Sequence, residues 1–241
     1  METTFGFYDL IETFTKPGCA VCNLLQAETT RLLDSILYEY ATDTSTQAAF
    51  RDSRGLCSEH GHQLTQMGNA LGIAVLYEHP LNDVLRILQG TAPGGGSQAR
   101  LMTRLFPQNP NGAIIDALTP TKPCIACASQ AETEARFVKI LSDFADDERM
   151  TGVFRASDGL CLPHFIQVLQ NTADPSRSRL LIAIQTDIWT RLRDELREFM
   201  RKNDYQHASE AITEAEGVSW RRVVARMAGE RGILSPRRTI S

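Results

Sequence analysis

All six cysteines of this chain fall in two similar stretches, each with a Cys-x-x-Cys pair followed some 35 residues later by Gly-Leu-Cys-x-x-His. The first stretch supplies Cys19, Cys22, Cys57 and His60, and the second supplies Cys124, Cys127, Cys161 and His164. Three thiolates and one imidazole form a typical donor set for a closed tetrahedral zinc site. The pattern therefore predicts two zinc ions per chain, one within each stretch.

An iron–sulfur cluster with one histidine ligand is the alternative cofactor that these residue types leave open. Disulfides fit less well. The N-terminus carries Glu2 where a secretory signal needs basic residues, and no apolar run follows it. No window approaches the 18 apolar residues that a membrane span requires. We therefore expect a cytoplasmic protein without membrane contact, and in a reducing compartment closely spaced cysteines are metal ligands more often than disulfides.

The two stretches align with each other over more than the cysteines. Residues 26–29 read Gln-Ala-Glu-Thr and recur at 130–133, and Phe-Arg-x-Ser-x-Gly-Leu-Cys-x-x-His at 50–60 recurs at 154–164. A repeat of roughly a hundred residues is too long for a solenoid module and fits a duplicated domain.

This alignment selects among the five histidines. His60 aligns with His164, whereas His62 aligns with Ile166, and His79 and His207 have no counterpart. A ligand role shared by both stretches can therefore belong only to His60 and His164. We expect the other three histidines to be ordinary surface or capping residues.

Hydrophobic residues spaced by three and four positions indicate helices almost throughout the chain, and no strand pattern is found. The expected helices cover 22–42, 58–78, 81–89, 127–145, 161–170, 177–202 and 208–229. The predicted fold is all-α, with two tandem helical repeats packed into one body. We expect repeat one at 1–90, a Gly-rich linker at 91–112, repeat two at 113–217 and a basic tail at 218–241.

Local sequence also predicts how the ligands are placed. Each Cys-x-x-Cys follows a proline-containing entry segment and leads into a helix, and each Cys-x-x-His puts its ligands on one face of a first helical turn. Gly55 and Gly159 are expected to end the preceding short helix in a left-handed conformation. All ligands then lie at helix N-termini, where the helix dipole favours thiolate over thiol.

Two further pairs of residues repeat near the ligands. Arg51 and Arg155 each stand six residues before the third cysteine, and Glu28 and Glu132 lie on the helix after the Cys-x-x-Cys pair. They either form an Arg–Glu ion pair between helices or donate from the arginine to the metal site.

The C-terminal residues 218–241 contain six arginines and one acid, a local charge of +5 in a chain whose net charge is −4, so residues 1–217 carry −9. An amphipathic helix around Trp220 presents Arg221, Arg222 and Arg226 on its basic side. It can contact nucleic acid, a partner helix or the protein's own acidic body, and we favour the last.

No Gly-x-Ser-x-Gly, Walker-type or His-Glu-x-x-His motif occurs in the sequence. The motif set at 17–64 and 122–168 resembles a family of uncharacterised bacterial helical proteins that is classed as a domain of unknown function. The resemblance implies a bacterial cytosolic protein and supplies no reaction.

The closed ligand sets and the missing catalytic motifs favour a non-enzymatic, zinc-stabilised helical scaffold that binds a protein partner, or nucleic acid through its arginine-rich tail. A thiol–zinc redox sensor is one alternative, because oxidation of metal-bound thiolates releases the ion. An enzyme or an electron carrier with an iron–sulfur centre is the other.

Overall fold

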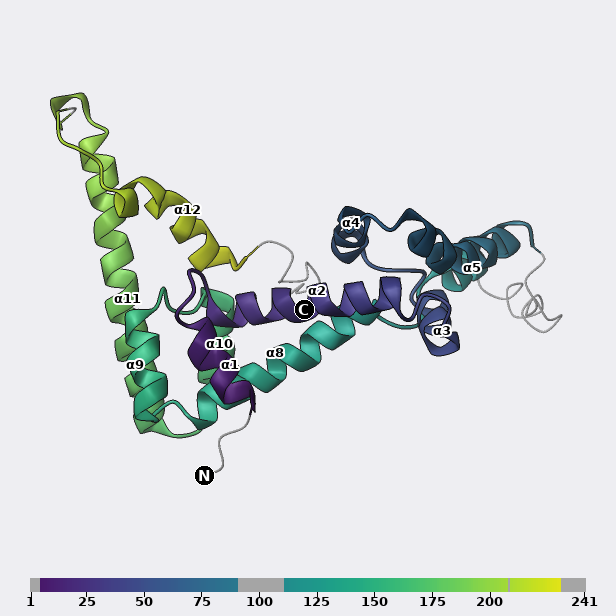
Figure 1. Ribbon diagram of the computed structural model, residues 1–241, viewed down its shortest axis with the longest axis horizontal. Helices are drawn as coiled ribbons and strands as arrows, with labels where there is room; N and C mark the ends of the chain where they lie inside the picture. Colours follow the sequence, from purple (N-terminus) through teal and green to yellow (C-terminus); the bar gives the residue numbers. More distant parts are fainter. Residues whose placement is uncertain (1–4, 91–110, 208, 231–241) are drawn as a thin grey trace. The chain divides into compact units, whose positions relative to one another are not determined.

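The computed structural model of the protein describes residues 5–90, 111–207 and 209–230, and these are helical with no strand among them. The helices, shown in Figure 1, are α1 (Phe5–Thr13), α2 (Ala20–Tyr38), α3 (Thr44–Asp52), α4 (Ser58–Gln66), α5 (Ala70–Leu88), α7 (Gly112–Leu118), α8 (Ile125–Asp143), α9 (Glu148–Ala156), α10 (Leu162–Asn171), α11 (Pro175–Lys202), the 3-10 turn η1 (Tyr205–His207) and α12 (Glu214–Ala228). The all-α prediction is confirmed. Residues 91–110 of the expected linker and 231–241 of the expected tail lie outside the described residues.

Side-chain caps fix where several of these helices begin. Asp43 accepts a hydrogen bond from the backbone N–H of Thr46 at the start of α3, and Asp147 does the same for Met150 at the start of α9. Such caps satisfy N–H groups that have no partner inside the helix. The predicted helix over 58–78 is wrong, because Gly68 adopts a φ of 89° there and Asn69 begins a new helix, α5.

The described helices fall into two compact units. Unit 1 comprises residues 1–28 and 130–241, and unit 2 comprises residues 29–129. The boundaries between them fall inside α2 and α8, so each unit contains residues of both similar stretches of sequence. The division into repeat one at 1–90, linker at 91–112, repeat two at 113–217 and tail at 218–241 remains a prediction.

Each unit has a hydrophobic core of its own. In unit 1 the start of α2 packs with α1, α8, α9, α10 and α11, and the ring of Phe14 lies 5.2 Å from that of Phe154. In unit 2 the end of α2 packs with α3, α4 and α5, and the ring of Phe50 lies 5.7 Å from that of Tyr77. Phe50 and Phe154 occupy the same position of the repeated motif, so this aromatic residue anchors a core in both units.

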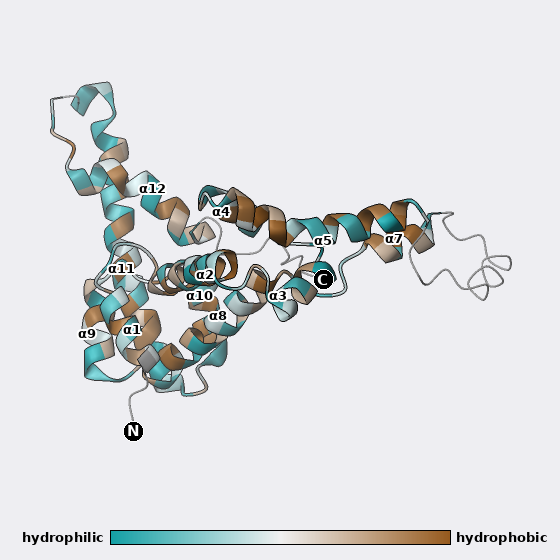
Figure 2. Cartoon of the chain, turned by 45° about the vertical axis from the view of Figure 1, so that its right-hand side comes forward, coloured by the Kyte–Doolittle hydropathy of each residue, from teal (hydrophilic) through white to brown (hydrophobic). Residues whose placement is uncertain are grey.

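Large apolar side chains are exposed on both units. Along α5 and α7 of unit 2, the hydropathy colouring of Figure 2 shows apolar residues, and several of them are exposed. They are Leu71, Leu81, Leu85, Leu88 and Ile115. No helix in the described parts of the chain is both long and apolar enough to cross a membrane.

Candidate metal centres

The eight predicted ligand residues come together in two groups of four. Cluster 1, in unit 1, contains Cys19, Cys22, Cys161 and His164, and cluster 2, in unit 2, contains Cys57, His60, Cys124 and Cys127. Each cluster therefore joins the Cys-x-x-Cys pair of one stretch to the Cys-x-x-His pair of the other. The prediction that each stretch forms a site from its own four residues was therefore wrong.

The length of α2 accounts for the pairing. A helix of 19 residues is about 28 Å long, so its two ends can belong to different cores. Cys19 and Cys22 lie at its start, whereas the residues that pack with α3 and α4 lie near its end. Cys57 follows the end of α2 in the chain and therefore lies in the core of unit 2. Cys22, at the start of α2, is joined by Cys161 and His164 of the α10 segment.

Helix starts position every ligand, as the sequence predicts. The carbonyl oxygens of Cys19 and Cys124 accept the backbone N–H four residues later, at 3.0 Å in both cases, as α2 and α8 begin. Cys57 and Cys161 stand directly before α4 and α10 in extended conformation, with a histidine three residues further on. The positive ends of these helices face the sulfur atoms and favour thiolates.

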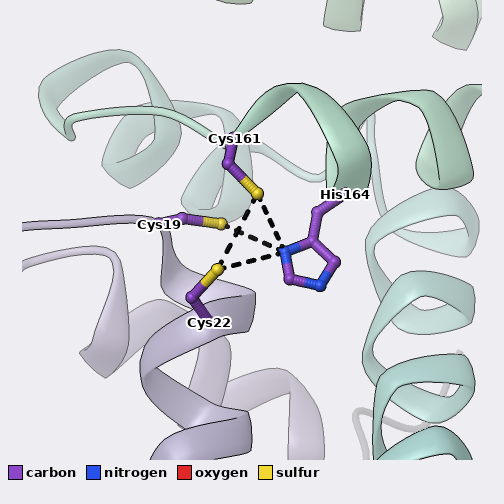
Figure 3. Close-up of side chains that lie close together, drawn as sticks. All are labelled: Cys19, Cys22, Cys161 and His164. Atoms are coloured by element: carbon purple, nitrogen blue, oxygen red, sulfur yellow. Dashed lines mark hydrogen bonds between the residues drawn. The ribbon is translucent and has the colours of Figure 1, made fainter. Parts of the chain in front are cut away.

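In cluster 1 the four donor atoms point at one another, as Figure 3 shows. The Sγ atoms of Cys19, Cys22 and Cys161 lie 3.5, 3.4 and 3.1 Å from Nδ1 of His164, and those of Cys22 and Cys161 lie 3.7 Å apart. All four residues are buried.

Cluster 2 repeats this geometry. The Sγ atoms of Cys57, Cys124 and Cys127 lie 3.3, 3.7 and 3.4 Å from Nδ1 of His60, and those of Cys57 and Cys127 lie 3.5 Å apart. Cys124 and His60 are buried, whereas Cys57 and Cys127 are only partly covered. None of the six cysteines forms a disulfide.

These distances match the edges of a small tetrahedron. Around a zinc ion with Zn–S bonds of about 2.3 Å and a Zn–N bond of about 2.0 Å, the sulfurs are about 3.8 Å apart and the nitrogen is about 3.5 Å from each sulfur. A cluster of several irons is a larger object with its ligands spread around it, so four donors within 4.8 Å of one another fit a single ion better. Both groups can therefore hold one metal ion each.

Without a bound ion, the donor atoms of cluster 1 share protons, and this sharing shifts their pKa values. Burial opposes ionisation of Cys19, but hydrogen bonds from Cys161, Cys22 and His164 outweigh it and hold the pKa of Cys19 well below its usual range. Burial lowers the pKa of His164, yet hydrogen bonds to Cys161 and Cys19 and the nearby carboxylate of Glu134 raise it to about 11. Binding an ion must displace the protons that these groups hold.

The same sharing occurs in cluster 2. A hydrogen bond from Cys127 lowers the pKa of Cys124 to about 3, with burial acting against it and His60 supporting it. The hydrogen bond donated to Cys124, together with burial, raises the pKa of Cys127 above its usual range. One thiolate in each group thus has its charge stabilised by neighbouring donors.

A carboxylate supports the histidine of cluster 1. Oε1 of Glu134 lies 3.1 Å from Nε2 of His164 and accepts a 2.7 Å hydrogen bond from Gln167. The contact has the distance of a hydrogen bond but not its direction, so the carboxylate acts on the ring as a nearby charge. A carboxylate behind a ligating histidine fixes the ring and strengthens its donor nitrogen.

Cluster 2 lacks this support. Nε2 of His60 is buried without a hydrogen-bond partner, and the residue that aligns with Glu134 is Thr30. The loop before Cys124 is held by Asp52, whose carbonyl accepts the N–H groups of Thr121 and Lys122 at 2.9 and 3.3 Å and whose carboxylate pairs with Nζ of Lys122 at 2.9 Å.

The loop that leads into cluster 1 is held by Asp158. Its Oδ2 accepts the N–H of Gly18 at 2.9 Å, and both carboxylate oxygens bind α12, through Arg222 and Arg226 at 3.0 Å. Burial acts to raise the pKa of Asp158, but the Gly18 N–H and the two arginines outweigh it, so that this pKa lies below its usual value. Arg222 also pairs with Glu195, so these two basic residues of α12 contact the acidic body, the contact favoured from the sequence.

Two glycines shape the turns before the third ligands. Gly55 and Gly159 have φ values of 88° and 78°, as predicted. The N–H of Gly55 donates to the carbonyl of Phe50 and closes α3, whereas that of Gly159 donates to the Ser157 hydroxyl, so Gly159 does not cap α9. A Cβ at Gly159 would also lie 2.7 Å from the Gln185 amide.

The other repeated residues do not join the clusters. Arg51 and Arg155 take part in no ion pair and donate to no cysteine among the described residues, so both interpretations of them were wrong. His62 and His79 are exposed, and His207 pairs with Glu210, all outside the clusters. Sequence reasoning missed Glu134, Gln167 and Asp158, because the first and last differ from their aligned residues, Thr30 and Arg54.

Comparison with known proteins agrees with the family resemblance. The chain is 25% identical over 224 residues to an uncharacterised 23.9 kDa protein of Caldicellulosiruptor sp. (strain Rt8B.4), encoded in the xynA 3′ region; the alignment covers 91% of this chain and 99% of the relative. No solved structure matches the chain. The model of a family of unknown function, DUF6062, matches residues 8–231, so the chain belongs to that family.

Proposed function

We propose that this protein is a non-enzymatic helical scaffold in which one zinc ion holds each unit together. The observation that carries the proposal is the geometry of the two clusters, in which three sulfurs and one nitrogen already stand at the corners of a zinc-sized tetrahedron. Four protein donors leave no open coordination position for water or substrate, which is typical of structural rather than catalytic zinc.

Zinc would act as a crosslink between elements that are distant in sequence. Cluster 1 joins the start of α2 to the start of α10, and cluster 2 joins the start of α4 to the start of α8. Such a crosslink contributes to folding because the unfolded chain has no preformed site. The free thiols it needs persist in a reducing compartment, which supports a cytoplasmic location.

The scaffold would serve to bind a protein partner. Five large apolar side chains are exposed on α5 and α7 of unit 2 and support this, since apolar surface beyond single scattered residues often marks an interaction site. Nucleic acid is less favoured, because Arg222 and Arg226 are already paired with Asp158 and Glu195. Arg231, Arg237 and Arg238 lie outside the described residues.

Metal analysis of the full chain, purified without added metal, tests the proposal. We expect two zinc ions per chain, a colourless protein, and loss of thermal stability after a strong chelator removes the metal. A brown protein that absorbs near 400 nm, or a chain that holds no metal and unfolds at the same temperature with and without chelator, would overturn it.

A further inference from the structure

The six cysteines differ in how well the protein covers them. In cluster 1, Cys19, Cys22 and Cys161 are 0% exposed. In cluster 2, Cys124 is 3% exposed, whereas Cys57 and Cys127 are only partly covered. Two cysteines of cluster 2 are therefore partly exposed to solvent, whereas the three cysteines of cluster 1 are not.

The sulfurs of the two partly exposed cysteines are also neighbours. Sγ of Cys127 lies 3.5 Å from Sγ of Cys57, and Nδ1 of His60 lies within 3.4 Å of both. A disulfide bond is about 2.05 Å long, so these two sulfurs must approach each other by about 1.5 Å to form one. The two residues come from different helix starts, α4 and α8, and a bond between them would hold the same elements that the ion holds.

We propose that Cys57 and Cys127 form an oxidation site at which a hydroperoxide releases the ion of cluster 2 while cluster 1 keeps its own. This inference rests on the proposed function, because it takes both clusters to hold zinc. Cysteine oxidation follows thiolate character and exposure. Metal coordination makes all six sulfurs thiolates, so exposure decides which of them react.

The chemistry balances with hydrogen peroxide as the oxidant. One thiolate attacks a peroxide oxygen, an S–O bond forms as the O–O bond breaks, and hydroxide leaves. The second thiolate attacks the resulting sulfenic sulfur, an S–S bond forms as the S–O bond breaks, and a second hydroxide leaves. Two protons from the buffer neutralise the two hydroxides, so two thiolates, one peroxide and two protons give one disulfide and two waters.

Release of the ion follows from the loss of donors. The disulfide removes two of the four ligands and leaves only Cys124 and His60, which are too few to hold zinc tightly. Reduction of the disulfide restores all four donors. The protein would thus contain one permanent site and one site whose occupancy follows the oxidant concentration.

Zinc release from the full, zinc-loaded chain during treatment with hydrogen peroxide tests this. We expect one zinc per chain to leave in a fast phase, about ten times faster or more than the second, because the two clusters differ in exposed sulfur. Alkylation and peptide mass spectrometry after the fast phase should find a disulfide between Cys57 and Cys127, and a thiol reductant with zinc should reverse it.

Matched variants assign the phases. Cys57→Ser should lose the fast phase and keep the slow one, and Cys161→Ser, the aligned cysteine of cluster 1, should keep the fast phase. Because either variant can lose stability, the wild-type disulfide map is the deciding measurement. Simultaneous release of both ions, or a first disulfide within cluster 1 or at Cys124, would overturn the inference while the proposed function stands. A chain that holds no zinc before oxidation would overturn both.

Discussion

Clusters 1 and 2 have the same four donors in the same local geometry, yet their surroundings differ. In unit 1 all four donors are buried, Glu134 stands behind His164, and Asp158 ties the entry loop to two arginines of α12. In unit 2 two sulfurs are partly covered and Nε2 of His60 has no partner. The positions that the two stretches share thus specify the ligands and their helix-start geometry, whereas positions at which the stretches differ, such as Glu134 and Asp158, give each cluster its own surroundings.

Loss of a metal ligand should have the largest effect on stability. Cys161→Ser is expected to remove the ion of cluster 1 and destabilise unit 1 severely, since structural zinc contributes on the order of 10 kcal/mol in small domains. Zinc content should fall from two to one per chain. Hydrogen exchange should show lost protection in α1 and α10 and retained protection in α3 to α5. Equal loss in both sets of helices would mean that the units do not depend on separate ions.

Replacement of Phe50 or Phe154 tests whether the two hydrophobic cores are independent. Phe154→Ala and Phe50→Ala each remove a buried ring, and we expect each to cost about 3–5 kcal/mol of unfolding free energy. Urea unfolding measures the cost, and hydrogen exchange locates it. Phe154→Ala should loosen the helices around Phe14, and Phe50→Ala those around Tyr77. A loss of protection confined to the same unit in both variants would contradict the separation into two cores.

The carboxylate behind His164 offers a smaller and more specific test. Glu134→Thr introduces the residue found at the aligned position of the first stretch, and we expect it to weaken zinc binding at cluster 1 about tenfold or more. Competition with a chromogenic chelator measures the change. Glu132→Thr, an exposed acid on the same helix, is the matched control and should leave the affinity unchanged. Equal affinities in all three proteins would remove Glu134 from the account of cluster 1.

The smallest effect is expected at the second histidine of α4. His62 is exposed and lies outside both clusters, so His62→Ala should change stability by no more than about 0.5 kcal/mol. His60→Ala should remove the ion of cluster 2. Zinc content and thermal unfolding of the two variants provide the comparison, and equal damage from both would show that the wrong histidine has been assigned.

Local features of this fold were predictable from the sequence because short-range physics determines them. Amphipathic spacing predicted α2 and α8, repeat alignment selected His60 and His164, and the positive φ values at Gly55 and Gly159 followed from the residue type. The pairing of the clusters was not predictable in this way. Cys57 and Cys161 are chemically identical partners for Cys22, and only the packing of the two ends of α2 into different cores separates them.

The residues that support cluster 1, Glu134 and Asp158, could not be predicted from the sequence for a related reason. Glu134 and Asp158 are ordinary acids at positions where the other stretch has Thr30 and Arg54, so the repeat gave no signal. Their roles depend on contacts with Gln167, Gly18 and α12, which lie far away in the chain. Alignment of a repeat with itself finds what the two copies share and overlooks what distinguishes them.

Zinc content of two double variants tests most directly whether each cluster draws its ligands from both stretches. Cys22→Ser with Cys161→Ser removes two ligands of one cluster, so this variant should still bind one zinc per chain. Cys22→Ser with Cys57→Ser removes one ligand from each cluster, so this variant should bind little or none. Equal zinc contents, or one zinc retained by the second variant and none by the first, would contradict the pairing.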